Sequence, residues 1–147
     1  MHILDLATIL CAAFMTGNEI AVSLFVNPVI WQLDETSQAK ALRLFAALGA
    51  KAMPFWYAAS LVLMVIEACL RLHQPAFPWI AAAAALWIAI IVYTLLVLLP
   101  INNRIAALEI KALPAGWLQQ HRKWDRHHRV RILLLVLAVV LLVQGIL

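Results

Sequence analysis

The chain has 147 residues, of which 66% are hydrophobic and 12% are charged, and its formal net charge is +4. Soluble domains are typically about 45–50% apolar and roughly 25% charged, so this composition excludes an ordinary soluble protein. The basic residues lie beside long apolar runs, which indicates membrane topology and no nucleic-acid partner. We predict one transmembrane domain over residues 1–147, an all-α integral membrane four-helix bundle in the lipid bilayer.

A polar, charged segment separates the first two predicted spans. Span one covers about residues 3–31, and Thr36 or Ser37 is expected to cap the helix that follows. Residues 37–51 combine basic and apolar side chains at helical spacing. This pattern predicts a short amphipathic interfacial helix between spans one and two, either lying on the membrane surface or leading into span two. Span two is expected over about residues 54–72.

The second half of the chain contains the clearest span, which covers about residues 79–99 without a charged side chain. Pro100 follows it and is expected to kink or end the helix. Span four is predicted at about 122–147, and its helix is expected to start earlier, near Leu118. The small residues Ala81–Ala85 could pack inside the monomer or against a second copy in a homo-oligomer.

The distribution of basic residues predicts the orientation in the membrane. Ten of the eleven Lys and Arg residues, all except Arg71, belong to the segments after span one and after span three. With four spans these segments share one side, and the positive-inside rule assigns that side to the cytoplasm. We therefore expect a bacterial inner (cytoplasmic) membrane protein with both termini outside the cytoplasm.

Span one carries a polar stripe, which is unusual inside a membrane. At about 100° per residue, Thr16, Glu19, Ser23 and Asn27 fall within roughly an 80° arc. Asn, Ser and Thr in such a stripe can act as interhelical hydrogen-bonding groups. The Glu19 carboxyl must be protonated, paired or bound to a cation, so it is either a structural or a functional group.

A second set of polar side chains is expected near the cytoplasmic side. On a helix, His121, Trp124, His128 and Arg131 share one face. By position along their spans, Asn27, Asn102, Asn103, His128 and Arg131 should lie at similar depth, with Glu19 about two turns deeper. A Glu and a His on facing helices could bind a metal, share a proton, or act as base and acid. The neighbouring basic residues have a simpler explanation as a collar that binds anionic lipid: Arg122, Lys123, Arg126 and Arg129.

Two segments give the sequence a resemblance to a known family. The first contains Gly17-Asn18-Glu19 and Phe25-Val26-Asn27-Pro28, and the second contains Pro100-Ile101-Asn102-Asn103 followed by Trp124-Asp125-Arg126-His127-His128-Arg129-Val130-Arg131. These motifs resemble the anthrone oxygenase-like family (DUF1772) of small four-span membrane proteins. The resemblance implies that Asn103, His128 and Arg131 are functional positions, with Glu19, Asn27 and Asn102 as further ones.

The resemblance also implies a chemistry, because family members oxidise anthrones to anthraquinones with molecular oxygen as co-substrate. For a small lipophilic anthrone- or quinone-like molecule, the base would be His128 or Glu19 and the cation Arg131. Asn102 and Asn103 would serve as amide donors. Asn27, Trp124, Trp56 and Tyr57 would line the site, although interfacial belt residues equally explain these aromatics. A cofactor is left open: a metal ion, held by Glu19 and His128, or none.

Two non-catalytic interpretations remain beside a membrane oxidoreductase. A four-span bundle could bind or transport a small molecule or a proton, with Glu19 as the titrating group. It could also be an accessory subunit whose polar face binds another membrane protein. A hydrolase is disfavoured, because the sequence contains no Gly-x-Ser-x-Gly motif and no zinc-protease motif.

Overall fold

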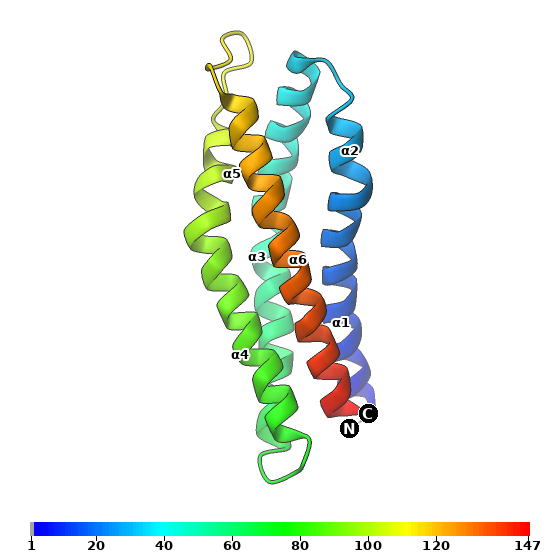
Figure 1. Cartoon of the computed structure of the whole chain (residues 1–147). Coiled ribbons are helices and arrows are strands. Elements are labelled where there is room, and N and C mark those ends of the chain that lie inside the picture. The colour runs from blue at the N-terminus through cyan, green and yellow to red at the C-terminus, as the bar shows by residue number, and fades with distance from the viewer. Residues whose placement is uncertain (1) are drawn as a thin grey trace.

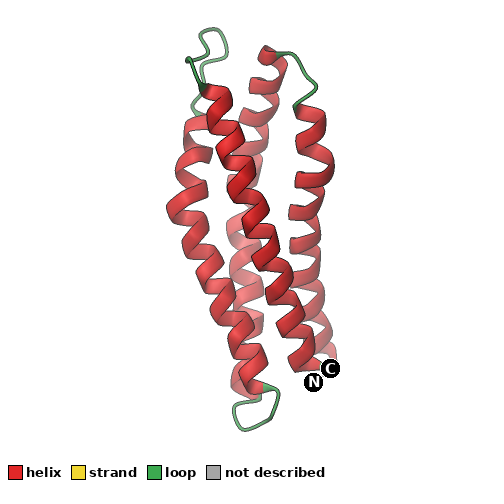
Figure 2. Ribbon diagram, viewed as in Figure 1, coloured by secondary structure: helices red, strands yellow, loops and turns green. Residues whose placement is uncertain are grey.

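The computed structural model describes residues 2–147, which form four long helical rods packed side by side (Figure 1). The rods run alternately up and down, so both termini lie at one end, together with the connection between the second and third rods. The other two connections lie at the opposite end. Figure 2 shows helices and loops only in this part of the chain. The prediction of an all-α four-helix bundle is confirmed.

Two of the rods contain a π-helical turn just before a proline. The first rod is α1 (His2–Ala21), η1 (Val22–Val26) and α2 (Asn27–Ile30), with Pro28 in the first turn of α2. The third rod is α4 (Phe77–Tyr93), η2 (Thr94–Leu98) and α5 (Leu99–Ala106), with Pro100 in the first turn of α5. Proline lacks an N–H and its ring crowds the carbonyl one turn earlier. The wider π turn relieves this crowding, so neither helix ends at its proline.

The second rod is a single helix, α3 (Glu35–Leu70), which continues through Pro54. Of the two alternatives for residues 37–51, the structure agrees with a helix that leads into span two, because these residues form the first turns of α3 and not a separate helix on the membrane surface. The N-cap is Asp34, which accepts a hydrogen bond from the Ser37 backbone N–H, and is neither Thr36 nor Ser37. At about 1.5 Å per residue, 36 residues reach about 54 Å, well beyond a hydrocarbon core of about 30 Å. The first turns of α3 thus extend the bundle beyond the membrane.

The last rod is α6 (Trp117–Ile146), which begins near the expected Leu118 and well before residue 122. All four rods are long and apolar enough to cross a bilayer: Ile3–Ile30, Glu35–Leu70, Phe77–Ala106 and Trp117–Ile146. Large apolar side chains on their outer faces are exposed, including Phe14, Phe25, Phe55, Leu96 and Leu133. Such a surface is stable only in contact with lipid tails. The chain is an integral membrane protein.

The helices pack most closely where α4 meets α6. Ala83 and Ala84 are buried there, so this part of the alanine run packs inside the monomer. A Cβ atom built on Gly145 would lie 2.7 Å from Cγ1 of Ile80, which shows how near the two backbones come. Trp87 fills the core beside them and donates its Nε1–H to the Tyr57 carbonyl oxygen at 3.1 Å. This packing fixes the rotation of α6 against its neighbours.

Candidate active site

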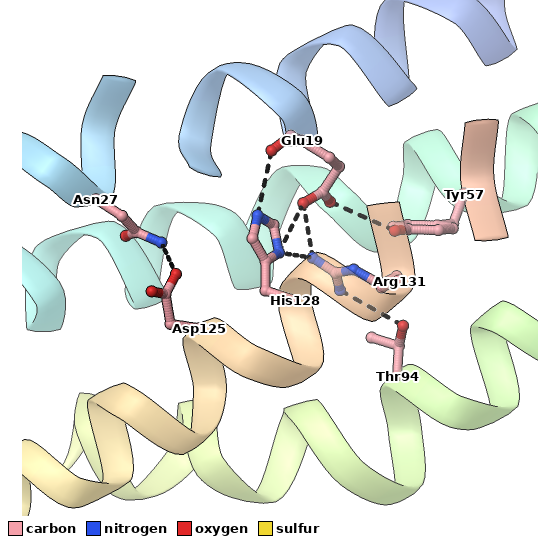
Figure 3. A network of polar contacts seen from close by, with 7 residues as sticks. All are labelled: Glu19, Asn27, Tyr57, Thr94, Asp125, His128 and Arg131. Carbon is pink, nitrogen blue, oxygen red and sulfur yellow. Dashed lines mark hydrogen bonds and ion pairs between the residues drawn. The ribbon is translucent and has the colours of Figure 1, made fainter. Parts of the chain in front are cut away.

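Each of the four rods brings a polar side chain to one level inside the bundle (Figure 3). Glu19 comes from α1, Tyr57 from α3, and Thr94 from the π turn η2, while α6 supplies both His128 and Arg131. Glu19 is 3% exposed, His128 0% and Arg131 6%. Since polar side chains at this depth are costly in a membrane, each must find a partner in the bundle. We call Glu19, His128 and Arg131 the central cluster.

The strongest contact of the central cluster is a buried ion pair. Nη2 of Arg131 lies 2.7 Å from Oε2 of Glu19, the length of a charge-assisted hydrogen bond. The other carboxylate oxygen, Oε1, accepts only a long hydrogen bond of 3.4 Å from the Tyr57 hydroxyl. Nη1 of Arg131 similarly donates to the Thr94 hydroxyl at 3.4 Å. Glu19 Oε1 is thus the carboxylate oxygen that is freer to accept another proton.

The contacts of His128 assign its tautomer. Nε2 lies 3.2 Å from the backbone carbonyl oxygen of Glu19, which can only accept, so Nε2 carries the proton. Nδ1 lies 3.0 Å from Nη2 of Arg131, which can only donate, so Nδ1 is unprotonated. A neutral imidazole satisfies both contacts.

Aromatic rings enclose the central cluster. The Trp124 indole stacks on the His128 imidazole with centroids 4.4 Å apart, and the Arg131 guanidinium lies 5.8 Å from the centre of the Tyr57 ring. These rings hold the polar groups in fixed orientations and keep the surroundings apolar. The arrangement therefore combines a carboxylate, a cation and an imidazole at low dielectric, where charges interact strongly.

Several buried polar atoms at the edge of the central cluster have no hydrogen-bond partner among residues 2–147. They are Oγ1 of Thr16, Nε of Arg131 and Nε1 of Trp124. Buried polar groups in native proteins are nearly always hydrogen-bonded, so unpartnered ones call for a ligand or water. A bound molecule with oxygen acceptors would satisfy the Arg131 and Trp124 donors.

The expected depth of Glu19 is wrong. Glu19 was placed about two turns below His128 and Arg131, but it contacts both. Asn27 lies nearer the end of the bundle that is opposite the termini and carries two connecting loops, which we call the loop end. There its Nδ2 donates to Oδ1 of Asp125 at 2.7 Å. The offset of α1 against α6 places Asn27 at the level of Asp125 and Glu19 at the level of His128 and Arg131.

Three predicted site residues are not part of the central cluster. Asn103 is exposed and Asn102 half-buried, and neither side chain hydrogen-bonds to the cluster among the described residues. The helix continues through Pro100, so both asparagines lie about two turns beyond Thr94, away from the end that carries the termini. Trp56 is turned toward α1, where its Nε1 donates to the Cys11 carbonyl oxygen at 3.1 Å. Tyr57 and Trp124 do contact the central cluster, Tyr57 through Glu19 and Trp124 through His128.

Two residues with polar contacts at the site were not predicted. Thr94 lies in an otherwise apolar span, and its hydroxyl was the signal that could have identified it. Asp125 occurs in the Trp-Asp-x-x-His motif, three residues before His128 and so on nearly the same helix face. It bridges Asn27 and Arg129, whose Nη2 lies 3.0 Å from Oδ2 of Asp125.

The donor set fits a metal ion poorly. Among residues 2–147, no three His, Cys, Asp or Glu side chains are grouped as metal ligands. Glu19 and His128 would contribute two ligands, but the Arg131 guanidinium already occupies the same carboxylate oxygen. A second cation at that position would be repelled by Arg131. The residues present fit an organic ligand better than a metal.

A second buried polar cluster lies toward the end of the bundle that carries the termini. Arg71 contacts both Glu67 on its own helix and Asp5 on α1, the latter at 2.5 Å. The Thr8 hydroxyl lies 3.3 Å from Oε1 of Glu67. Glu67 is fully buried, so it provides a matched control for Glu19: a buried carboxylate paired with arginine, but without a histidine or stacked indole in these contacts.

Comparison with curated proteins and with solved structures gives no match. A family model does match, described as anthrone oxygenase, over residues 42–141. The match includes Tyr57, Thr94, His128 and Arg131, whereas Glu19 lies outside it. It extends over about two thirds of the chain, from the first turns of α3 into the last turns of α6. The chain therefore belongs to the anthrone oxygenase family.

Proposed function

We propose that the protein is a membrane-embedded oxygenase that oxidises a lipid-soluble aromatic substrate, anthrone- or quinone-like, with molecular oxygen. The observation that carries the proposal is the central cluster: a buried carboxylate, guanidinium and imidazole from two facing helices. Family membership supplies the reaction class. An apolar planar substrate would reach this level of the bundle from the bilayer.

The proposed reaction begins with removal of a proton from the substrate's methylene carbon. The resulting enolate is stabilised because its negative charge spreads over an aromatic system and onto an oxygen atom. It reacts with dioxygen to form a hydroperoxide at that carbon, which loses water to give a ketone. In total, one CH2 group and one O2 become one C=O group and one H2O, so atoms and electrons balance.

Glu19 is proposed as the base, through Oε1, because that oxygen accepts only a long hydrogen bond. Arg131 stabilises the enolate oxygen, since its Nε has no partner among the described residues and its charge acts at low dielectric. His128 holds Arg131 and Glu19 in position through Nδ1 and Nε2. Tyr57 and Thr94 would take the hydrogen-bonding role expected of Asn102 and Asn103.

The test is oxygen uptake by the purified protein in detergent with anthrone as substrate, together with anthraquinone formation followed by absorbance. A protein-free sample gives the rate of spontaneous oxidation, which is subtracted. We expect Glu19→Gln and Arg131→Gln each to lose at least about 100-fold in rate, as for removal of a base or a charge-stabilising group. His128→Ala should also lose activity, because Arg131 and Glu19 lose the contacts that hold them in position.

The matched control is Glu67→Gln, which makes the same change at a buried, arginine-paired carboxylate outside the central cluster. It should keep most of the activity. Equal activity in wild type, Glu19→Gln and Arg131→Gln would reject the central cluster as the active site. Wild-type uptake equal to the protein-free rate would reject anthrone as a substrate.

A second candidate function is binding or transport of a proton or small molecule, and the polar side chains between the two buried clusters favour it. Thr8, Ser60 and Thr16 are buried on the seam of α1 and α3, and Ser60 Oγ lies 3.3 Å from Cys11 Sγ. In liposomes with an internal pH dye, this function predicts a proton flux that Glu19→Gln and Glu67→Gln both remove. An oxygenase predicts that only Glu19→Gln changes activity.

The bacterial inner membrane and an orientation with both termini outside the cytoplasm are part of the proposal. The basic segments of α3 and α6 lie at the loop end, opposite the termini (Figure 1). The positive-inside rule then assigns the loop end to the cytoplasm.

A further inference from the structure

A groove of about 620 Å³ lies on the outside of the bundle, between Trp31 at the end of the first rod and α6. Three arginines line it: Arg122, Arg126 and Arg129. Asp125 also lines it, so the formal charge of the groove is three minus one, or +2. Val130 and Leu133 form its apolar end. The groove is open to the surroundings and is separate from the central cluster.

Two of the three arginines have no polar partner. Among residues 2–147, neither Arg122 nor Arg126 forms a hydrogen bond or an ion pair with another side chain, whereas Arg129 pairs with Asp125 at 3.0 Å. The Arg122 guanidinium lies 5.8 Å from the centre of the Trp31 ring, so the ring holds it at the groove wall. The groove therefore presents positive charge that the chain itself leaves uncompensated.

The position of the groove along α6 relates it to the membrane surface. On the outer face of α6, the exposed arginines Arg122, Arg126 and Arg129 are followed by exposed apolar side chains from Val130 to Val140. This change from charged to apolar side chains is typical of the boundary between lipid headgroups and lipid tails. The arginines lie at headgroup level, while Leu133, at 71% exposed, lies among lipid tails.

We propose that this groove binds the headgroup of an anionic phospholipid. The phosphate would be held by Arg122 and Arg126, since guanidinium groups bind phosphate oxygens in pairs of hydrogen bonds. One acyl chain would continue over Val130 and Leu133, which follow directly on the same side of α6. A free phosphate would use the arginines but not this apolar continuation, which is why a lipid is the better occupant.

The experiment measures binding of a fluorescently labelled phosphatidylglycerol to the full-length protein in an uncharged detergent, by fluorescence anisotropy. Each basic side chain near a lipid phosphate strengthens binding about fivefold, so Arg122→Gln/Arg126→Gln/Arg129→Gln should weaken it about 100-fold. The matched control is Lys40→Gln/Lys111→Gln/Lys123→Gln, which removes the same charge from exposed positions that do not line the groove. Its loss should stay below about tenfold.

Equal losses in the two triple variants would overturn the proposal in favour of a diffuse basic collar. Competition by phosphatidylcholine as strong as by phosphatidylglycerol would overturn it, because it would remove the role of headgroup charge. Full displacement by inorganic phosphate at the lipid's own concentration would show a free-anion site instead. If the groove triple variant does not fold, Arg126→Gln decides, because Arg126 has no polar partner to lose. A loss of about fivefold supports the proposal, and unchanged binding overturns it.

Discussion

Replacing Arg131 by glutamine should destabilise the bundle strongly. The guanidinium is 6% exposed and donates to Glu19 at 2.7 Å, so the substitution leaves a buried carboxylate without its counter-charge. Removing one partner of a buried ion pair typically costs about 3–5 kcal/mol. We expect a loss of this size in the free energy of unfolding, measured by titration of the protein in mixed micelles with a denaturing detergent.

Arg129→Gln is the matched control, because it makes the same substitution on the same helix. Arg129 also pairs with a carboxylate, Asp125, at 3.0 Å, but its side chain is 67% exposed. Exposed pairs contribute about 0–1 kcal/mol, so this variant should unfold close to wild type.

The double variant Glu19→Gln/Arg131→Gln tests whether the loss arises from the uncompensated charge. With both charges removed, it should be more stable than Arg131→Gln alone by at least about 1 kcal/mol. The interpretation fails if Arg131→Gln and Arg129→Gln lose the same stability. It also fails if the loss in the double variant equals the sum of the losses measured separately for Glu19→Gln and Arg131→Gln.

Other changes also have expected outcomes. Gly145→Ala should cost about 1–3 kcal/mol, because its Cβ would lie 2.7 Å from Ile80 Cγ1 and 3.0 Å from Trp79 Cβ. Gly17→Ala meets nothing within 4 Å and should be neutral or stabilising, and unfolding titrations of the two variants together check the packing. Hydrogen bonds from Ser37 lower the pKa of Asp34 below 3.8, so this cap stabilises α3 at neutral pH and is lost as the pH falls through the lowered value. Hydrogen exchange of the first α3 amides should show this loss, and in Asp34→Asn it should be absent. Alkaline phosphatase fused to the C-terminus should be active, and a fluorescent protein fused there should be dark, if the termini lie outside the cytoplasm.

Composition and hydrophobic runs were sufficient to predict the four spans, because a bilayer demands about 20 apolar residues for each crossing. Composition and hydrophobic runs did not predict the full length of the helical rods. The first turns of α3 bury Gln38, Ala39 and Leu42 against neighbouring elements, and sequence periodicity alone cannot distinguish such packing from packing against a membrane surface. The sequence therefore left open whether residues 37–51 lie on the membrane surface or lead into span two.

The candidate site was partly predictable. Glu19 stood out because a charged group is rare within an apolar span, and His128 and Arg131 stood out because they share a helix face and belong to the motif that resembles the family. Their mutual contact depends on the offset between α1 and α6 along the bundle axis, which follows from how the helices pack and not from the periodicity within one helix. Asn103 was predicted from a motif that follows a proline. It is exposed because α5 continues the helix beyond η2, and no sequence pattern specified which face of α5 would point outward.

The π turn η1 has a consequence for how the first rod meets α6. Glu19 and Asn27 are eight residues apart, and on a regular α-helix they would differ by about 80° in angular position. A π turn contains one residue more than an α-helical turn and so reduces this difference in angular position by about 100°. Glu19 and Asn27 are then only about 20° apart around the helix axis. One side of α6 can therefore meet both residues, Asn27 through Asp125 and Glu19 through His128 and Arg131. The extra residue of η1 thus turns Glu19 and Asn27 toward the same side of α6, and Pro28, whose ring favours the wider turn, stabilises this π turn.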